Sequence, residues 1–425
     1  MSAVPAAAAT SVMPARRRIL LSAFACSPLW GSEPGVGWNW LRLLACDHDV
    51  TLLTHAFFRS HLEPALASAG LQVSVHYLQA PSFGAHPHRQ LNSRAYYTWW
   101  QVWARRAARR ILATQRFDLV HHLTWGTVRF PCLLGGLGVP LVMGPLGGGE
   151  AAPLRLFSGL PWRVRLFDGL RALSLHAIRL DPLAMAGPRR ATLVLCKSAE
   201  SARVLPRDVQ RRSAVLPEIG SPPIDTSARE CGRAPSDGGH RLLFAGRLLG
   251  WKGVAMAVGA VDLLVQRGLD VSLDIAGDGP LRPHLEEEVR RRGLSERVRL
   301  LGMVPRADLF ALYSRADLFV FPSLHDSSGN VVLEALSRGL PVVCLDLGGP
   351  RLYVDEDCGV VVSTAGRGRE QVEAALADAI AGVLAEPGRL QAMSRSAVVH
   401  AARQSWDTVV SRAYRVISQH VGWAA

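Results

Sequence analysis

Short apolar runs alternate with longer amphipathic stretches along almost the whole chain, and this alternation most constrains its fold. Most runs are continuous stretches of Val, Ile and Leu, which is typical of strands buried on both faces of a parallel sheet. Amphipathic segments between them, such as 281–293 and 330–338, have the spacing of crossover helices. The expected strands are 17–25, 48–55, 71–78, 117–124, 140–147 and 192–198, then 240–247, 271–277, 298–304, 318–323, 341–347 and 359–363. The pattern predicts an α/β protein with two Rossmann-like, doubly wound parallel sheets.

Composition divides the chain into segments. Residues 221–239 are rich in Pro, Gly and Ser and have no apolar periodicity, which indicates a linker. The prediction is a disordered tail at 1–15, an N-terminal domain at 16–222, a linker at 223–239, a C-terminal domain at 240–402 and a final helical segment at 403–425. Two such domains leave a cleft between the carboxyl ends of their strands, where ligands of these sheets bind.

The chain is strongly basic, with 48 basic and 35 acidic side chains, a formal net charge of +13, and only two lysines, Lys197 and Lys252. This excess suits an anionic partner: a nucleic acid, an acidic membrane surface or a phosphorylated substrate. No apolar run reaches the roughly 18 residues of a membrane-spanning helix. The segment 16–26 imitates a signal peptide, but the glycine-rich sequence after it favours a first buried strand. The seven cysteines have no metal-ligand spacing, so we expect neither a disulfide framework nor a zinc site. This pattern favours a protein of the reducing cytoplasm.

Two cations follow the first strand of the second half. Arg247 ends this strand, and Lys252 lies five residues later, before the next expected helix. An arginine fork and a lysine point charge on one strand-end loop suit a diphosphate. The alternative is two solvated cations in a basic protein. The glycines at the neighbouring strand ends, with one aspartate, are predicted to complete the binding site for the molecule that carries this diphosphate: Gly246, Gly277, Asp278 and Gly279.

Two carboxylates lie eight residues apart in the segment DSSGNVVLE. The expected helix begins near Gly329 or Asn330, so Asp326 precedes it and Glu334 lies in its second turn. Free backbone N–H groups at this helix start, together with Ser328, would attract an anion or a polar ligand. Glu334 would accept hydrogen bonds from a ribose and Asp326 from sugar hydroxyls. The alternative is an acidic residue that complements the helix dipole, followed by a solvated glutamate.

These motifs occur together as GR-x4-KG, AGDGP and PS-x2-D-x7-EAL-x2-GLPVV over roughly residues 240–350. This ordered set resembles the retaining glycosyltransferases of family 4, which have the two-domain GT-B architecture. The resemblance implies that Arg247 and Lys252 hold the donor diphosphate, that Glu334 binds the ribose, and that Asp326 and the backbone after it contact the donor sugar. Asp326 stands where the family typically has glutamate. It also implies that the last helix crosses back to the N-terminal domain.

The first half carries two glycine-rich loops. Residues 31–37 follow the first strand, with a helix expected near Trp38, and the resemblance makes this loop face donor and acceptor. Gly35 and Gly37 are predicted to approach the donor, because glycine permits close backbone approach. Glu33 and the glycines of the loop after residue 146 are assigned to the acceptor side: Gly147, Gly148 and Gly149. The alternative for both loops is a tight turn without a ligand.

His121 and His122 end the strand FDLVHHL, and strand alternation sends them to opposite faces. The resemblance suggests a histidine near this strand end, close to the donor sugar, and we assign His122 to the cleft. The commoner family pattern would place a second histidine at Leu123. The alternative is a packed histidine with no catalytic part.

Arginines and aromatic residues cluster in two stretches. Residues 64–117 hold seven arginines and no carboxylate, and Trp99 and Trp103 share a face of the expected helix. Residues 154–180 hold five arginines against Asp168. Tryptophan with arginine suits the headgroup zone of an anionic membrane, as an acceptor on a lipid carrier would require. The alternative is that the aromatic faces pack in the core.

The sequence thus predicts a metal-independent enzyme that moves a sugar from a nucleotide-diphosphate sugar to a hydroxyl of a glycan or lipid-linked acceptor, with retention implied by the resemblance. It is expected in the cytoplasm, at the inner face of the membrane, with no cofactor and no nucleic acid. Three alternatives remain: a sugar-nucleotide epimerase or phosphorylase on the same fold, a basic nucleic-acid binder, and a homologue that binds donor without transfer.

Overall fold

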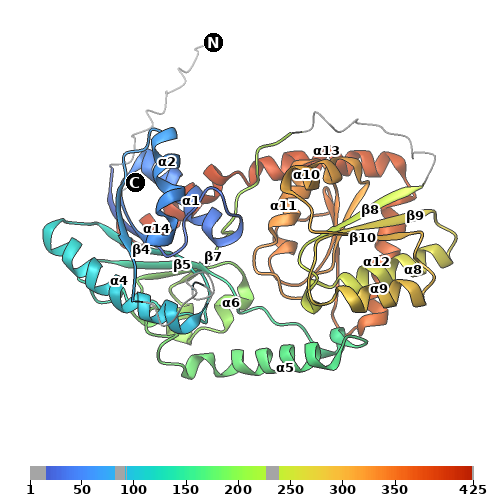
Figure 1. Cartoon of the computed structure of the whole chain (residues 1–425), viewed down its shortest axis with the longest axis horizontal. Coiled ribbons are helices and arrows are strands. Elements are labelled where there is room, and N and C mark those ends of the chain that lie inside the picture. Colours follow the sequence, from blue (N-terminus) through green and yellow to red (C-terminus); the bar gives the residue numbers. More distant parts are fainter. Residues whose placement is uncertain (1–15, 82–90, 92, 226–238, 424–425) are drawn as a thin grey trace, which may run out of the picture.

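The computed structural model describes residues 16–81, 91, 93–225 and 239–423. They form two lobes, each with a central sheet covered by helices (Figure 1). The predicted tail at 1–15 and most of the predicted linker lie outside the described residues.

The N-terminal sheet has seven parallel strands in the order β3-β2-β1-β4-β5-β6-β7. The strand order reverses between β1 and β4, and the chain leaves the sheet there in opposite directions. Every residue of β4 is buried, as a central strand covered on both faces requires. The strands are β1 (Arg18–Ala23), β2 (Asp49–His55), β3 (Ser74–Leu78), β4 (Leu119–Thr124), β5 (Leu141–Leu146), β6 (Leu193–Cys196) and β7 (Ser213–Val215).

The C-terminal sheet has six parallel strands in the order β10-β9-β8-β11-β12-β13. Its strands are β8 (His240–Ala245), β9 (Val271–Ala276), β10 (Val298–Gly302), β11 (Leu318–Phe321), β12 (Val342–Leu345) and β13 (Gly359–Val362). The helices of this lobe are α8 (Val254–Gln266), α9 (Arg282–Arg291), α10 (Arg306–Arg315), α11 (Asn330–Ser337), α12 (Arg369–Leu384) and α13 (Pro387–Arg403).

The predicted architecture of two doubly wound parallel sheets is confirmed. All twelve expected strands are present, each shorter than its apolar run by one to three residues. The sequence missed β7, which has three residues and is only partly buried. Such a short edge strand has too few apolar residues to produce a recognisable run.

The last helix lies on the N-terminal lobe (Figure 1). Helix α14 (Trp406–Val421) packs against α1 (Ser32–Asp47). The Tyr414 hydroxyl lies 3.0 Å from His121 Nδ1 on β4, and Ser221 forms a backbone bridge with Ser405. The chain therefore passes between the lobes before β8 and returns after α13.

A helix along the lower edge of both lobes makes a further connection (Figure 1). This helix, α5 (Trp162–Ala177), follows the short helix η2 (Leu154–Phe157) in the N-terminal half of the sequence. The turn between η2 and α5 nevertheless contacts the C-terminal lobe, where Arg369 Nη1 donates to the Ser158 carbonyl oxygen (2.9 Å). Arg369 is itself buried and paired with Glu288 and Glu373. Separating the partners of a buried ion pair is strongly destabilising. These pairs therefore hold the Arg369 side chain in place, and with it the Ser158 end of the connection.

Helix α4 (Arg94–Thr114) does not present the aromatic surface that the sequence suggested. Trp99 and Trp103 are partly buried and pack against the core, in an edge-to-face pair with ring centroids 6.0 Å apart. Arg105 donates to the carbonyl oxygens of Leu133 and Gly135, so it holds a loop. The alternative interpretation, core packing, therefore describes these tryptophans. No helix in the described part of the chain is long and apolar enough to cross a bilayer.

Gly253, the residue before α8, is predicted to be required for the loop that carries Lys252. Its φ is 72°, and a Cβ atom there would lie 1.9 Å from the Pro322 carbonyl oxygen. Gly268 has a similar φ of 81° with nothing within 4 Å, which makes it a matched control. We expect Gly268→Ala to lose about 1–2 kcal/mol of unfolding free energy, the cost of left-handed backbone. Gly253→Ala should lose about 1–3 kcal/mol more through overpacking. Equal losses in urea unfolding would contradict this packing.

Candidate active site in the interdomain cleft

A cavity of about 880 Å³ lies between the lobes. The N-terminal domain contributes the start of α1, the end of β6 and the segment before the linker, while the C-terminal domain contributes the loops after β8 and β11. Helix α5 closes one side. The polar residues that line the cavity are Ser32, Glu33, Arg129, Arg171, Ser174, Lys197, Glu218, Lys252, His325, Asp326, Ser327, Ser328 and Asn330.

Lys252 and Asp326 form an ion pair on the C-terminal side. The Lys252 ammonium lies 4.5 Å from the Trp251 ring centroid and 5.2 Å from that of Phe321, in cation–π contact with both. Burial acts to raise the pKa of Asp326, but the charge and hydrogen bond of Lys252 and two backbone amides offset it. The pKa of this carboxyl is therefore held below its ordinary value, and the pair is ionic at neutral pH.

The backbone around Asp326 forms a tight loop before α11. Asp326 Oδ1 accepts from the amides of Ser328 (3.4 Å) and Gly329 (3.3 Å), and Gly329 adopts a φ of 67°. Gly348 and Gly349 press on this loop, since a Cβ on either would lie 2.3 or 2.2 Å from the carbonyl oxygens of Asp326 and Ser327. The sequence analysis missed this support, which the dipeptide Gly-Gly after β12 signals.

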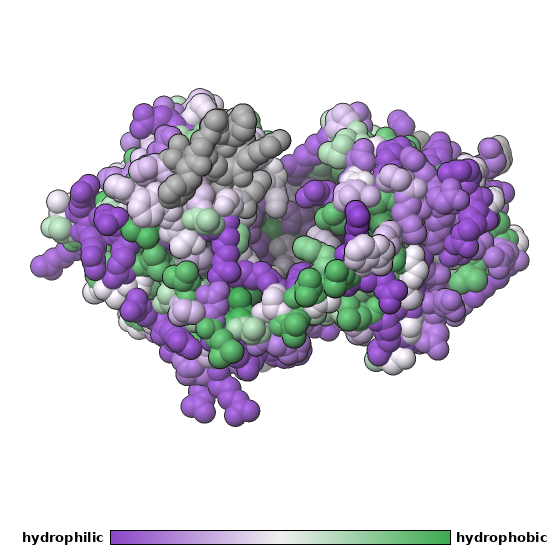
Figure 2. Space-filling model, turned by 60° about the horizontal axis from the view of Figure 1, so that its bottom comes forward, coloured by the Kyte–Doolittle hydropathy of each residue, from purple (hydrophilic) through white to green (hydrophobic). Residues whose placement is uncertain are grey.

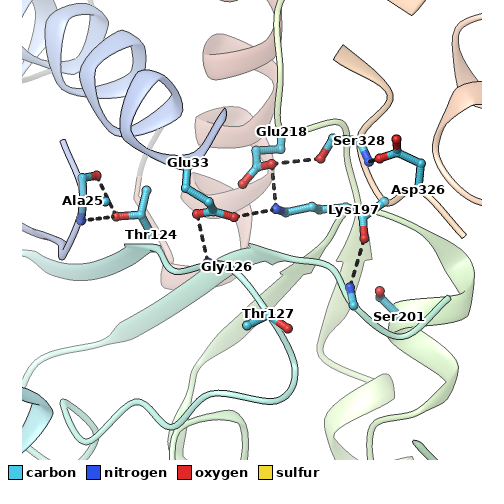
Figure 3. Close-up of polar contacts among 12 residues, drawn as sticks. Ala25, Glu33, Thr124, Gly126, Thr127, Lys197, Ser201, Glu218, Asp326 and Ser328 are labelled. Carbon is cyan, nitrogen blue, oxygen red and sulfur yellow. Dashed lines mark hydrogen bonds and ion pairs between the residues drawn. The ribbon is translucent and has the colours of Figure 1, made fainter. Parts of the chain in front are cut away.

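Serines of this loop reach carboxylates of the N-terminal domain. Ser328 Oγ donates to Glu218 Oε2 (3.1 Å; Figure 3). Ser327 Oγ donates to Glu150 Oε2 (2.6 Å). Glu150 is buried and also accepts from the Ser198 and Ser201 hydroxyls. The loop that carries Asp326 is thus fixed to both domains.

Lys197 lies at the centre of the N-terminal side. Its ammonium is 2.7 Å from Glu218 Oε2 and 3.1 Å from Glu33 Oε1, with Lys197 only 6% exposed and Glu218 3% (Figure 3). Burial acts to lower the pKa of Lys197, but the two carboxylates raise it above its ordinary value, so it stays charged. One cation cannot neutralise both carboxylates, of which Glu218 is buried and Glu33 partly exposed. Burial, opposed by Lys197 and reinforced by Glu33, raises the pKa of Glu218 to about 7.

The sequence analysis missed Lys197 and Glu218 as site residues. The one available signal was that Lys197 is one of only two lysines and follows the apolar run of β6. Glu218 Oε1 is buried with no hydrogen-bond partner among the described residues, although the side chain lines the cavity. An unpaired buried carboxylate oxygen is costly, so this atom is suited to a hydroxyl or ammonium donor from a ligand.

His325 is a second residue that the sequence analysis missed. It precedes Asp326, stacks on Trp251 with ring centroids 4.7 Å apart, and its Nε2 lies 2.9 Å from Asp168 Oδ1 on α5. Burial lowers the pKa of His325, and the hydrogen bond to Asp168 opposes this only in part. The contact holds α5 against the wall of the cavity. Because Asp168 is buried there, it does not neutralise the charge of the exposed arginines on the outer side of α5.

Of the other predicted donor residues, some line a cavity and others do not. Glu334 lies in an adjoining cavity of about 610 Å³, within 3.4 Å of Arg306 and 3.3 Å of the Tyr313 hydroxyl, and burial raises its pKa. Asn330 lines both cavities. Arg247 is exposed, lines neither cavity and has no ion pair within the described residues. The structure thus pairs Lys252 with Asp326 and leaves Arg247 apart from it.

The glycines at the ends of β8 and β9 pack backbone against backbone. A Cβ on Gly277 would lie 2.0 Å from the Gly246 carbonyl oxygen, and one on Gly279 would lie 2.6 Å from that of Leu248. Asp278 Oδ1 accepts from the Gly279 amide (2.6 Å). None of the four predicted residues here lines either cavity, so the described contacts give them a role in holding two strand ends together.

The first glycine loop differs from its prediction. Helix α1 begins at Ser32, not near Trp38, so Gly35 and Gly37 lie within the helix. A Cβ on Gly37 would lie 2.4 Å from the Ala25 carbonyl oxygen, which makes this glycine a packing contact with the end of β1. Gly35 lines the adjoining cavity and Glu33 the main one, where it also accepts from the Gly126 amide (3.2 Å).

The second glycine loop meets the C-terminal domain. A Cβ on Gly147 would lie 2.7 Å from that of Ser327, and the Gly148 amide donates to Ser327 Oγ (3.1 Å). The Gly149 amide donates to Ser201 Oγ (3.1 Å). The loop therefore contacts the other domain, as a cleft-facing segment would, but its glycines do not line the cavity.

His122 does not enter the cleft, contrary to our assignment. Its Nε2 lies 2.8 Å from the Tyr97 hydroxyl on α4 and its Nδ1 3.2 Å from Ser22 Oγ, so it packs beneath that helix. His121 faces the other way, toward Tyr414 on α14. Strand alternation was thus predicted correctly, but helices cover both faces of this central strand. Leu123 is buried too.

One set of side chains within the described residues has the spacing of metal ligands: Asp355, Cys358 and His400. None of them lines either cavity. The prediction that the reaction needs no metal stays a prediction.

Comparison with known proteins places this cleft in context. Residues 239–386 match the family described as Glycosyl transferases group 1. A D-inositol 3-phosphate glycosyltransferase 2 of Catenulispora acidiphila is 30% identical over 322 residues, which cover 72% of this chain and 71% of that protein. An alpha-D-kanosaminyltransferase of Streptomyces kanamyceticus is 30% identical over 261 residues, 56% of this chain and 65% of that protein. Over the first three curated relatives, the alignments span 65%, 50% and 44% of the relatives' length.

The architecture also has solved counterparts. A sucrose-phosphate synthase from Thermosynechococcus elongatus superimposes with a TM-score of 0.64 at 20% identity, over 96% of this chain and all of that one. The two facing sheets are therefore the GT-B architecture.

The buried, neutral His122 predicts a loss of stability in acid. Burial lowers its pKa to about 3, whereas the unfolded side chain titrates near 6.5. Its contribution to stability is fully present above about pH 6.5 and falls as the pH falls, by about 1.4 kcal/mol per unit. Because burial also lowers the pKa of His55 and His121 to about 4, His122→Gln should make the slope in urea unfolding shallower by about that amount between about pH 6.5 and about pH 4.5. Identical slopes for variant and wild type would contradict the neutral, packed role.

Proposed function

The chain belongs to the group 1 glycosyltransferases, and on this basis we propose that it moves a sugar from a nucleotide-diphosphate sugar to a hydroxyl of an acceptor. The observation that carries the proposal is the Lys252–Asp326 pair, which lines the interdomain cavity within the segment that matches the family. In a sugar diphosphate the cation can bind the diphosphate and the carboxylate can accept hydrogen bonds from the sugar hydroxyls.

The donor diphosphate takes the place of Asp326 at the Lys252 ammonium. This exchange is balanced, because an anion replaces an anion and the ammonium never lacks a partner. Lys252 then stabilises the negative charge that grows on the diphosphate as the bond to the sugar breaks, the kind of oriented charge that contributes most to such catalysis. Arg247, five residues earlier on the same loop, is the second cation that we assign to the diphosphate, although its side chain lines neither cavity. These two charges support a reaction without a metal ion.

Asp326, released from Lys252, accepts hydrogen bonds from the donor sugar. Its carboxylate is already oriented by the amides of Ser328 and Gly329. Glu334 accepts from the ribose hydroxyls in the adjoining cavity, where Arg306 and Tyr313 hold it. The base extends toward the strand ends near Gly277. Transfer retains the anomeric configuration, which rests on the motif resemblance to retaining family 4.

The acceptor binds on the N-terminal side of the cavity. Glu218 carries an unpaired buried oxygen there, and Lys197 and Ser328 hold the carboxylate in place through its other oxygen. This arrangement suits a polyhydroxylated acceptor such as a glycan. We assign the acceptor to a lipid-linked or polysaccharide precursor and the enzyme to the inner face of the membrane, with the exposed apolar and basic residues of α5 in support.

Replacing Lys252 tests the proposal. Lys252→Met keeps the apolar stem against Trp251 but removes the charge, and it should reduce kcat/KM about 100- to 1,000-fold. The assay is release of nucleoside diphosphate from UDP-, GDP- and ADP-sugars, and the melting temperature checks the fold. Arg267→Met, which removes an exposed cation paired with Asp378, is the control and should keep wild-type rates. Full activity of Lys252→Met would exclude the diphosphate role.

A further inference from the structure

We infer that the outer face of α5 is a docking surface for an anionic lipid bilayer. This helix exposes large apolar side chains at successive turns, with Trp162 66%, Leu166 52%, Leu170 58% and Leu173 68% exposed. At 100° per residue these four lie within a single sector of the helix. Just beyond the helix, Leu180 is 84% exposed. Figure 2 shows apolar side chains gathered along the connection between the lobes, on the side where α5 lies.

The inner face of the same helix packs against the rest of the molecule. Val164 packs against Gly250, Asp168 binds His325, and Leu175 is buried. The exposed leucines therefore do not belong to a core contact that the lobes fail to complete. They form a stripe with no cover within the described residues, bordered on one side by the main cavity, which Leu170 also lines. A contiguous exposed apolar stripe on a soluble protein marks an interaction site.

The charges beside the stripe select the partner. Arg163 and Arg165 flank it on α5, and Arg155 and Arg179 stand at the two ends of the segment, all exposed. Within residues 154–181, all of which are described, no exposed, unpaired carboxylate opposes them, because Asp168 is buried against His325. Asp181, the one other acid here, is paired with Arg94. Apolar side chains rimmed by arginine suit an interface with acidic headgroups, where arginine stems follow the apolar surface and their charges meet phosphates.

A second copy of the chain fits this face less well. A symmetric dimer through α5 would bring the same arginines of both copies together, with no acid nearby to pair with them, and like charges across an interface are strongly unfavourable. An anionic bilayer supplies the missing negative charge and buries the leucines at once. The surface expected on α4 from the sequence is thus replaced by one on α5, whose stretch the sequence also indicated.

The position of α5 gives this surface a consequence for the acceptor. Phe167, Leu170, Arg171 and Ser174 line the main cavity, so one helix separates bilayer from cleft. Phe167 is 65% exposed at the edge of that cavity. This step rests on the proposed function: an amphipathic acceptor would keep its hydrocarbon part in the bilayer beside Leu166 and extend its hydroxylated head past Phe167 to the cleft.

Vesicle co-sedimentation tests the surface directly. The full chain should sediment with phosphatidylglycerol-containing vesicles, less with pure phosphatidylcholine, and less at high salt. The double variant Leu166→Ser, Leu173→Ser should lower the partition coefficient at least about tenfold. Arg163→Gln with Arg165→Gln should reduce binding to the anionic vesicles alone. Val399→Ser, at an exposed apolar position on α13 at the opposite edge of the molecule, should bind like wild type.

Two results would overturn the inference: wild-type protein that stays in the supernatant with anionic vesicles, or a Leu166/Leu173 variant that binds as well as the Val399 control. Light scattering provides a third, since a wild-type dimer that the double variant abolishes would assign the stripe to a second copy. Melting temperature and nucleotide binding are measured on each variant without vesicles, so a failed transferase proposal and a failed membrane surface are distinguished.

Discussion

Each of the chain's two lysines carries its charge inside the interdomain cleft, and each needs carboxylates from distant parts of the sequence to do so. An ammonium removed from water is stable only when paired, because its desolvation costs several kcal/mol. Lys197 on the N-terminal side is held by Glu33 and Glu218, and Lys252 on the C-terminal side by Asp326. The first set fixes α1 and the segment before the linker to the end of β6, and the second fixes the loop after β8 to the loop before α11.

The Asp326 loop joins the two sets of charges. Ser328 reaches Glu218 across the cleft and Ser327 reaches Glu150, so the carboxylate that pairs with Lys252 also depends on the N-terminal domain. Glycines on both sides let the backbones approach, as the contact between Gly147 and Ser327 illustrates. A ligand that displaces Asp326 from Lys252 therefore acts on a loop held by both lobes. Binding in the cleft and the relative placement of the domains are physically linked through this loop.

The sequence predicted those parts of the molecule that depend on local patterns. Continuous apolar runs located twelve strands, and charge at strand ends identified Lys252, Asp326 and Glu334, all of which line cavities. Features that depend on tertiary packing were not predictable. Alternation correctly separated His121 from His122, but nothing local showed that α4 would cover His122. Glu218 precedes the linker without a motif, and its role arises only because Lys197 and Ser328 are brought to it. Trp99 and Trp103 were assigned to a membrane surface because the spacing of apolar residues along a helix is the same whether that face contacts lipid or the protein core.

The most direct test of the central claim is whether a diphosphate binds at Lys252 without a metal ion. The measurement is thermal unfolding of the full chain with EDTA, in rising concentrations of UDP, GDP or ADP and of the matching nucleosides. The account predicts that one nucleoside diphosphate raises the melting temperature progressively, as linkage requires, while its nucleoside gives much less and Lys252→Met abolishes the difference. Equal shifts for nucleoside and diphosphate, or an undiminished shift in Lys252→Met, would contradict it.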